Sequence, residues 1–107
     1  MDTQIDLRGV SGTVYRYRIA NPTRPNIAGS GNFVYVRDAE GSPQVVYAGE
    51  TDSLALESLL RWDEAVRQYG ATHIFMRLNV SGATRATELG DLLPVLEPVM
   101  NQRARAA

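Results

Sequence analysis

The chain lacks cysteine and lysine and has one histidine, His73. The absence of cysteine excludes disulfides, thiolate metal sites and a cysteine nucleophile. A single histidine excludes a multi-histidine metal site. No apolar run approaches the ~18 residues of a membrane span, and the opening MDTQIDLRG lacks the apolar stretch of a signal peptide. These absences predict a soluble cytoplasmic protein without a membrane partner.

The net charge is also small, because eleven basic residues, all arginine, balance twelve acidic ones and leave −1. This balance is not that of a dedicated nucleic-acid binder. With 107 residues, 44% of them apolar, the chain fits one domain. We expect this domain to span residues 1–101, with a flexible polar tail at 102–107.

Hydrophobic periodicity indicates four strands and at least two helices. A period of two, rich in β-branched and aromatic residues, predicts a strand at 13–20 and a hairpin with a longer loop from 33–38 and 44–50. Helical spacing begins at Leu54 and ends near a capping Gly70. A strand at 71–79 and a helix from about Thr84 follow, with Pro94 kinking that helix or opening a second one. This order predicts an α+β fold with helices packed on a small, mostly antiparallel sheet.

Several sequence words at the hairpin and after it resemble those of one family. They are GNFVYV (31–36), VVYAGETDSL (45–54) with Tyr47 and Gly49, GATHI (70–74), and a closing pattern of Arg85, Asp91, Leu92, Leu93, Pro98 and Asn101. Together they resemble the GIY-YIG nuclease superfamily, in particular its small bacterial members. The segment 7–19 resembles the extra strand that those members carry before the motif.

The resemblance implies a three-stranded antiparallel sheet flanked by helices, with a phosphodiester-cleaving site on one face. In active members two hairpin tyrosines, an arginine of the first helix and a glutamate of a later helix form this site, and the glutamate holds one divalent cation. The cation polarises the phosphate, while the arginine neutralises the charge that develops. Magnesium or manganese is therefore the cofactor expected of an active member.

Three of these four positions depart from the family pattern. The first tyrosine aligns with Phe33, and Tyr35 replaces it only if the strand slips by two residues. Tyr47 keeps the second hydroxyl. The arginine position holds Glu57, whose charge has the opposite sign, and the metal position holds Leu89.

Two nearby residues are candidate substitutes for the missing groups. Arg61 lies one helical turn after Glu57, and we expect the two to form an exposed i,i+4 ion pair. Glu88 is adjacent to Leu89, but neighbouring helix positions point about 100° apart, which turns its carboxylate away from the site.

Other polar residues have simpler interpretations. Asn101 with Pro98 is expected to anchor a helix end, and His73 on an apolar strand is expected to be structural. Seven acidic residues and one arginine between Asp38 and Glu64 predict an acidic face, which repels nucleic acid. The candidate nucleic-acid contacts lie elsewhere, on a solvated face opposite Tyr15 and Tyr17: Arg8, Arg16, Arg18 and Arg24.

Three functional hypotheses follow. The first is a GIY-YIG-like domain without nuclease chemistry that binds a nucleic-acid or protein partner beside Phe33, Tyr47, Glu57 and Arg61, and that needs no cofactor. The second is a metal-dependent endonuclease that uses Tyr35 or Tyr47, Arg61 and a relocated Glu88. The third is an acidic adaptor for a basic protein. The edge of the opening strand would also suit a homodimer.

Overall fold

The computed structural model describes the backbone of residues 2–23 and 27–106, and side chains as far as residue 102. These described residues form five strands and four helices. The strands are β1 (Gln4–Arg8), β2 (Val14–Ala20), β3 (Gly31–Ala39), β4 (Ser42–Thr51) and β5 (His73–Leu78). The helices are α1 (Leu54–Glu57), α2 (Trp62–Tyr69), α3 (Gly82–Leu96) and α4 (Val99–Ala106).

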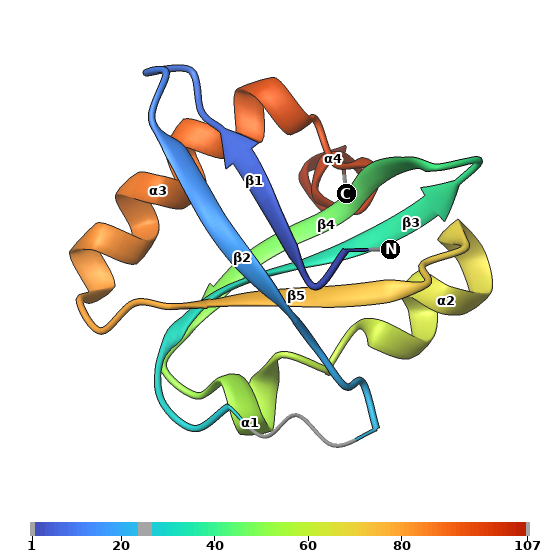
Figure 1. Cartoon of the computed structure of the whole chain (residues 1–107), viewed down its shortest axis with the longest axis horizontal. Coiled ribbons are helices and arrows are strands. Elements are labelled where there is room, and N and C mark those ends of the chain that lie inside the picture. Colours follow the sequence, from blue (N-terminus) through green and yellow to red (C-terminus); the bar gives the residue numbers. More distant parts are fainter. Residues whose placement is uncertain (1, 24–26, 107) are drawn as a thin grey trace.

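All strands join one antiparallel sheet in the order β1-β2-β5-β3-β4, which curls as Figure 1 shows. The predicted α+β class is therefore confirmed. The hairpin of β3 and β4 forms as predicted, and β5 pairs with both β3 and β2. Sequence periodicity missed β1, because QIDLR is too short for its alternation to stand out.

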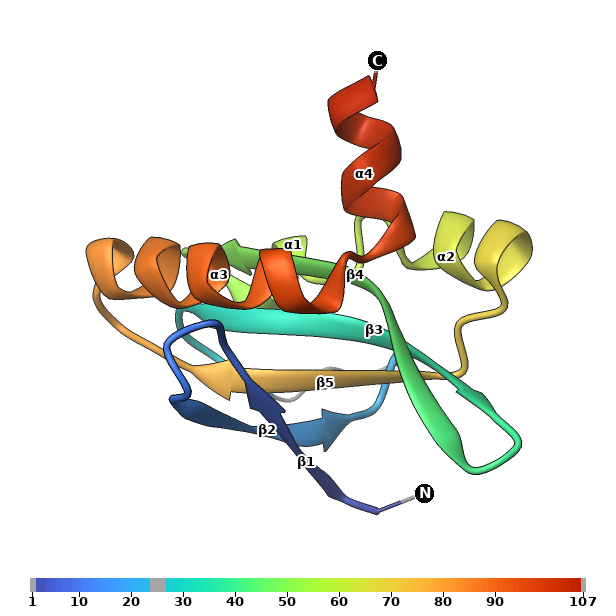
Figure 2. The same cartoon turned by 90° about the horizontal axis from the view of Figure 1, so that it is seen from above.

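Each face of the sheet has its own core. We call the side of Phe33, Tyr35, Ile74 and Met76 the first face, and it is covered by residues of α1, α2 and α4. The second face carries Tyr15, Tyr17, Val34, Val36, Ala48 and Phe75, and α3 covers it with Leu92. Figure 2 shows α3 lying along β3 and β4, while α4 leaves the sheet steeply. Alternate residues of β3, β4 and β5 thus serve different cores, whereas those of β1 and β2 alternate between the second core and solvent.

The helix expected from Leu54 to Gly70 is divided into α1 and α2. The Ser58 hydroxyl donates to the carbonyl of Leu54, and the Ser58 carbonyl accepts the Tyr35 hydroxyl at 2.6 Å. A serine that bonds to the backbone competes with the helical ladder, and here a tertiary contact takes up the carbonyl as well. Gly70 caps α2 as predicted, with φ 71°.

The C-terminal region is more helical than expected. Pro94 lies in the last turn of α3, which ends at Glu97 in a left-handed conformation (φ 45°). The helix α4 then begins at Val99 and includes residues 102–106, for which we expected a polar tail; residue 107 lies outside the described residues. The Pro98 carbonyl accepts the N–H groups of Asn101 and Gln102, which starts this helix.

Within the described residues no helix has the length and apolar character needed to cross a membrane.

Candidate functional site

Three aromatic rings gather on the first face of the β3–β4 hairpin. The ring centroids of Phe33, Tyr35 and Tyr47 lie 5.3 to 5.9 Å apart. Gly49 pairs with Phe33 across the hairpin, and a Cβ atom at Gly49 would lie 2.8 Å from the Phe33 ring. The small residue therefore makes room for the cluster.

Two hollows adjoin these rings, and together we call them the aromatic groove. The smaller, of about 220 Å³, is lined by Phe33, Tyr35, Tyr47, Glu57 and Arg61 among others. The larger, of about 520 Å³, shares Tyr47 and Arg61 and adds Gly90, Pro94, Asn101 and Gln102. The fold thus brings together most of the groove residues that the resemblance identified.

The hydroxyl chemistry of the groove is limited to Tyr47. Phe33 has no hydroxyl, and Tyr35 is fully buried and donates its hydroxyl to the Ser58 carbonyl. Burial raises the pKa of Tyr35 to about 12, so this hydroxyl stays protonated at neutral pH. Tyr47 is half-buried and lines both hollows. It is the one tyrosine of the hairpin placed to meet a ligand.

Arg61 is held in place from two sides. Its Nε and Nη2 donate to the Glu64 carboxylate at 3.1 and 3.0 Å, and its guanidinium lies 5.0 Å from the centroid of the Tyr47 ring. Hydrogen bonding by Glu64 also raises the pKa of Arg61 above its ordinary value. The Tyr47 hydroxyl also acts on this guanidinium, so Nη1 and that hydroxyl are placed to meet one ligand together.

The predicted ion pair between Glu57 and Arg61 is wrong. The helix α1 ends at Glu57, so the two residues are not separated by one regular helical turn. The Glu57 carboxylate instead accepts the Thr51 hydroxyl at 2.8 Å, beside the rings. A negative charge therefore stands in the groove where the resemblance calls for a positive one.

Neither of the α3 positions tied to metal binding, 88 and 89, brings a carboxylate into the groove, although Glu97, which caps α3, lines the larger hollow. Leu89 packs against the core of the second face. Glu88 is buried there too and accepts Arg77 Nε at 2.9 Å. Arg77 lies two residues after Phe75 on β5 and therefore shares its face of the sheet. Gly90, Leu93 and Pro94 of α3 line the groove, and an added Cβ at Gly90 would meet no atom within 4 Å. The relocation of Glu88 required by the endonuclease hypothesis is absent from this structure.

Sequence reasoning treated Arg85 and Asp91 only as letters of a motif, whereas the structure makes both structural. Arg85 is 4% exposed and donates to Glu50 (2.7 Å), Asp52 and the carbonyls of Asn79 (3.1 Å) and Val80 (2.8 Å). It thereby ties α3 to the ends of β4 and β5. No local pattern announces such partners, because they lie far away in the sequence.

Asp91 secures the β1–β2 hairpin against α3. Its carboxylate accepts the Ser11 N–H at 2.9 Å, the Ser11 hydroxyl at 2.7 Å and the Tyr15 hydroxyl at 2.8 Å. These donors, with Ser11 first, hold the pKa of Asp91 below its usual range.

The predicted acidic face is partly neutralised. Of the seven acidic residues between 38 and 64, Glu50 and Asp52 pair with Arg85, Glu64 pairs with Arg61 and Asp63 pairs with Arg67. Since Arg85 and Arg67 lie outside that segment, counting charges along the sequence overstated the local negative potential.

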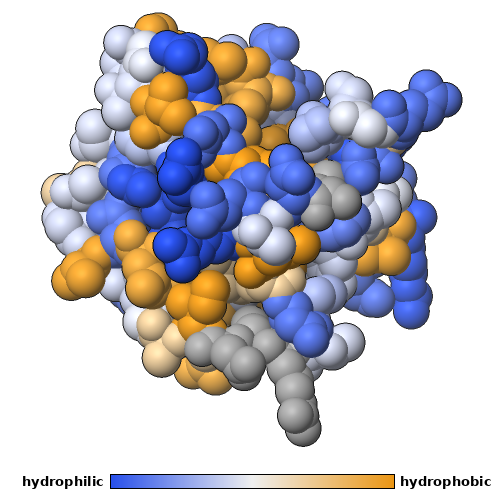
Figure 3. All heavy atoms as spheres, viewed as in Figure 1, coloured by the Kyte–Doolittle hydropathy of each residue, from blue (hydrophilic) through white to orange (hydrophobic). Residues whose placement is uncertain are grey.

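The arginines proposed as nucleic-acid contacts lie mostly on the outer side of β1 and β2. Arg16 and Arg18 are exposed while Tyr15 and Tyr17 are buried, as predicted. Figure 3 shows hydrophilic residues gathered over the middle of this face. Arg16 pairs with Asp6 at 3.0 Å and Arg8 donates to the Gly12 carbonyl at 3.1 Å. Arg24 lies outside the described residues.

Asn101 and His73 have the structural contacts expected of them. The Asn101 side chain accepts the N–H of Ala48 at 2.9 Å and donates to its carbonyl at 2.8 Å, which anchors α4 on β4. The His73 Nδ1 lies 2.7 Å from the Thr72 hydroxyl.

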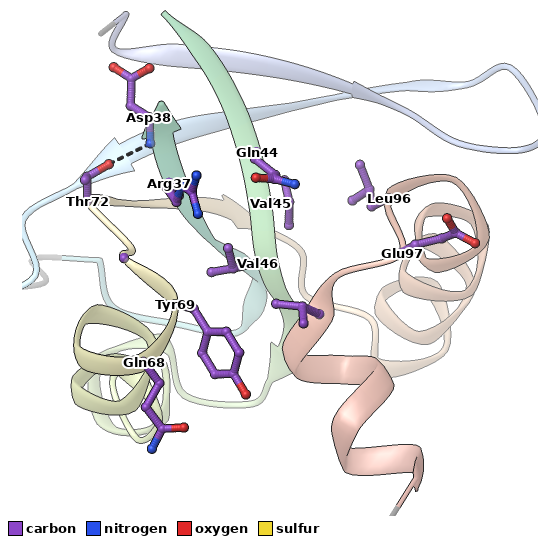
Figure 4. Close-up of a pocket in the computed structure, with 12 residues that line it drawn as sticks. Arg37, Asp38, Gln44, Val45, Val46, Gln68, Tyr69, Thr72, Leu96 and Glu97 are labelled. Atoms are coloured by element: carbon purple, nitrogen blue, oxygen red, sulfur yellow. Dashed lines mark hydrogen bonds between the residues drawn. The ribbon is translucent and has the colours of Figure 1, made fainter. Parts of the chain in front are cut away.

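A separate pocket of about 630 Å³ was not foreseen from the sequence. It lies between the outer half of the β3–β4 hairpin, the end of α2 and the α3–α4 junction. Figure 4 shows Tyr69 and Gln68 on the α2 side, Leu96 and Glu97 on the other, and Asp38 pointing away from it. Across residues 2–23 and 27–102, no group of three or more histidine, aspartate or glutamate side chains is placed to hold a metal ion.

Comparisons of the chain with protein-family models, with curated proteins and with solved structures find no match.

Proposed function

We propose that the chain is a GIY-YIG-type domain that has lost phosphodiester cleavage and binds a partner through the aromatic groove. A nucleic-acid phosphate is the partner group that suits Nη1 of Arg61 and the Tyr47 hydroxyl. The observation that carries the proposal is the content of the groove: aromatic rings, the Tyr47 hydroxyl and Arg61 line it, while the first tyrosine hydroxyl and the metal-holding carboxylate of an active member are missing.

The losses bear on separate steps of metal-assisted hydrolysis. Leu89 packs in the core and Gly90 has no side chain, so the family's metal position supplies no carboxylate to the groove. With Tyr35 bonded to Ser58 and a phenylalanine at position 33, Tyr47 alone remains to assist a water. Glu57 would repel a phosphate from the smaller hollow, so we place the bound phosphate in the larger hollow, beside Tyr47 and Arg61. Binding there needs none of the groups that cleavage requires.

The features that remain suit recognition. Arg61 is preorganised by Glu64 and by the Tyr47 ring, so little side-chain freedom is lost when it meets an anion. Leu93, Pro94 and Pro98 give the larger hollow an apolar wall beside these polar groups. Binding pockets commonly combine a largely apolar lining with a few placed polar groups.

A cleavage assay tests the loss of chemistry. Supercoiled plasmid and branched DNA are incubated with the protein and magnesium or manganese. We expect no cleavage above that of a Tyr47→Phe control. Metal-dependent cleavage that disappears in Tyr47→Phe would overturn the proposal.

An amide-resolved NMR titration tests binding and locates it. A short DNA duplex and a single strand of the same sequence are added at low salt. We expect shifts around Tyr47, Glu57, Arg61 and Asn101, and at least a fivefold weaker association in Arg61→Gln. Arg67→Gln is the matched control, because Arg67 is exposed, pairs with Asp63 and lines neither hollow of the groove. Shifts confined to Arg8, Arg16 and Arg18, or none at all, would contradict the groove as a nucleic-acid site.

A further inference from the structure

The two edge strands of the sheet, β4 and β1, differ in whether their outward backbone groups are covered. At the β4 edge, the Asn101 amide bonds to both the N–H and the carbonyl of Ala48, as a neighbouring strand would. Nearer the hairpin tip, Pro43 stands in β4 and has no N–H to offer. Proline, irregular pairing and covering groups are common ways to block a sheet edge. The β4 register also shifts between Tyr35 and Val36.

The β1 edge has no such cover. Hydrogen bonds link Gly9 N–H to the Thr13 carbonyl and Ile19 N–H to the Thr3 carbonyl, at the two ends of the β1–β2 pairing. In an antiparallel pair every second residue directs its backbone N–H and carbonyl towards the partner strand. Since residues 3 and 9 bond to the β2 side, the odd-numbered residues of β1 face β2. The N–H and carbonyl groups of Gln4, Asp6 and Arg8 therefore point outward, and the same three residues are exposed.

A hollow of about 600 Å³ lies along this edge. Residues 2–6, Arg16 and Pro43 line it. A second hollow of about 280 Å³ continues it between Ile5 and the hairpin tip, with Asp2, Asp38 and Pro43 in its wall. The larger one falls within the about 300–1,000 Å³ of typical ligand pockets. The open edge is thus bordered on its far side by the tip of another hairpin, which leaves a channel for a single chain.

Negative charge predominates in the two hollows, which lie at the Asp2 end of β1, whereas Arg8 stands at the other end. The carboxylates of Asp2, Asp6 and Asp38 lie in their walls, and Arg16 is the one basic residue of the two linings. Arg16 forms an ion pair with Asp6. Neither the Asp2 nor the Asp38 carboxylate has a hydrogen-bond or ion-pair partner among the described residues. A lysine- or arginine-bearing chain would complement both of them.

We propose that β1 is a strand-addition site that binds an extended, positively charged segment of a partner protein. The backbone of the segment pairs with Gln4, Asp6 and Arg8, and its basic side chains reach Asp2 and Asp38. Main-chain bonds supply affinity in this mode of recognition, while alternate side chains supply specificity. A second copy of the chain suits the channel less well than a single strand does. Its β1 is already paired with β2, so a two-stranded hairpin would have to fit into a space that Pro43 borders.

The test uses a blocked heptapeptide of alternating lysine and valine, titrated into the whole labelled protein. We expect chemical-shift changes at Gln4, Asp6 and Arg8, slower amide exchange at these residues, and weaker binding at high salt. The same peptide with glutamate in place of lysine should not bind. Equal binding of both peptides, or no change along β1, would overturn the proposal.

Two variants separate edge pairing from simple charge attraction. Gln4→Pro removes an outward N–H that β2 does not use, so the fold stays and binding weakens by about fivefold or more. Gln4→Ala keeps the N–H and should bind as the wild type does. The double variant Asp2→Asn, Asp38→Asn should weaken binding several-fold. Sedimentation of the unliganded wild type as a dimer that Gln4→Pro dissociates would assign the edge to a second copy, and would overturn the proposal.

Discussion

The two faces of the sheet use their polar side chains differently. On the second face and at the start of α3, Arg77 bonds to Glu88, Arg85 to Glu50 and Asp52, and Tyr15 to Asp91. On the first face, Tyr47 and one side of Arg61 remain directed into open hollows. No buried side-chain nitrogen or oxygen lacks a partner in the described part of the chain. The difference indicates that α3 secures the fold, while the groove holds the groups available to a ligand.

The strongest test of this contrast is Arg85→Met. The substitution leaves the Glu50 carboxylate and two carbonyls without their buried donor, and we expect a fall in the melting temperature of at least about 10 °C. Differential scanning calorimetry measures it. Arg67→Met removes an arginine whose side chain is 77% exposed and should change the melting temperature by no more than about 2 °C. Equal effects of the two substitutions would remove the distinction between the faces.

Glu88→Ala comes next. It strips the partner of Arg77 from a buried position, and we expect the free energy of unfolding to fall by about 2–3 kcal/mol in urea titrations. Glu88→Gln keeps the shape and one acceptor, so it should cost less. An unchanged urea midpoint in Glu88→Ala would mean that this pair does not secure α3. The expected loss also makes Glu88→Ala a poor probe of catalysis, because lower activity would follow from unfolding alone.

A smaller effect is expected at Tyr35, where the first face does contribute to stability. Tyr35→Phe removes the hydrogen bond to the Ser58 carbonyl and should lower the free energy of unfolding by about 1 kcal/mol. Tyr47→Phe, whose half-buried hydroxyl lies beside the Arg61 guanidinium, should change it by less than about 0.5 kcal/mol. Chemical denaturation of both variants under the same conditions compares them directly; a larger loss in Tyr47→Phe would reverse their assigned roles.

The same tyrosine predicts how stability depends on alkaline pH. Burial raises the pKa of Tyr35 from 10.0 to about 12, so the unfolded chain loses this proton first. The contribution is fully present below about pH 10 and is lost as the pH rises towards about 12. Urea midpoints measured across this range should fall less steeply in Tyr35→Phe. The buried Tyr17, whose pKa burial also raises, contributes in the same direction in both proteins.

The smallest effect is expected from Gly90→Ala. The glycine lies within α3 and an added Cβ meets only open space, so the change should raise the free energy of unfolding by about 0.5–1 kcal/mol. Thermal unfolding measures the gain. Loss of stability instead would show that the groove beside Gly90 is filled or closed in solution.

Local sequence patterns were sufficient for much of the fold. Alternation identified the hairpin, the burial of Tyr15 and Tyr17 beneath exposed arginines, and the strand at β5; a left-handed Gly70 ended α2. The division of the first helix was not predictable in this way, because the Ser58 carbonyl is diverted by Tyr35, which lies on a strand.

The candidate site shows the same limit. The position of Phe33, Tyr47 and Arg61 around one groove followed from the motif words. The pairing of Arg61 with Glu64 and the burial of Glu88 depend on where α1 ends and how α3 is rotated on the sheet. Both are properties of packing, which the spacing of letters does not encode. The GIY-YIG relationship itself stays a proposal.

The place of β5 in the sheet has a consequence for synthesis. The β1–β2 and β3–β4 hairpins each join neighbouring segments, but only β5, made later, connects them through β2 and β3. A nascent chain that has emerged only as far as Gly70 therefore holds two hairpins with nothing between them. Until the ribosome releases residues 73–78, the inner edges of β2 and β3 stay unpaired, and this is the interval in which the growing chain is most open to mispairing or to a chaperone.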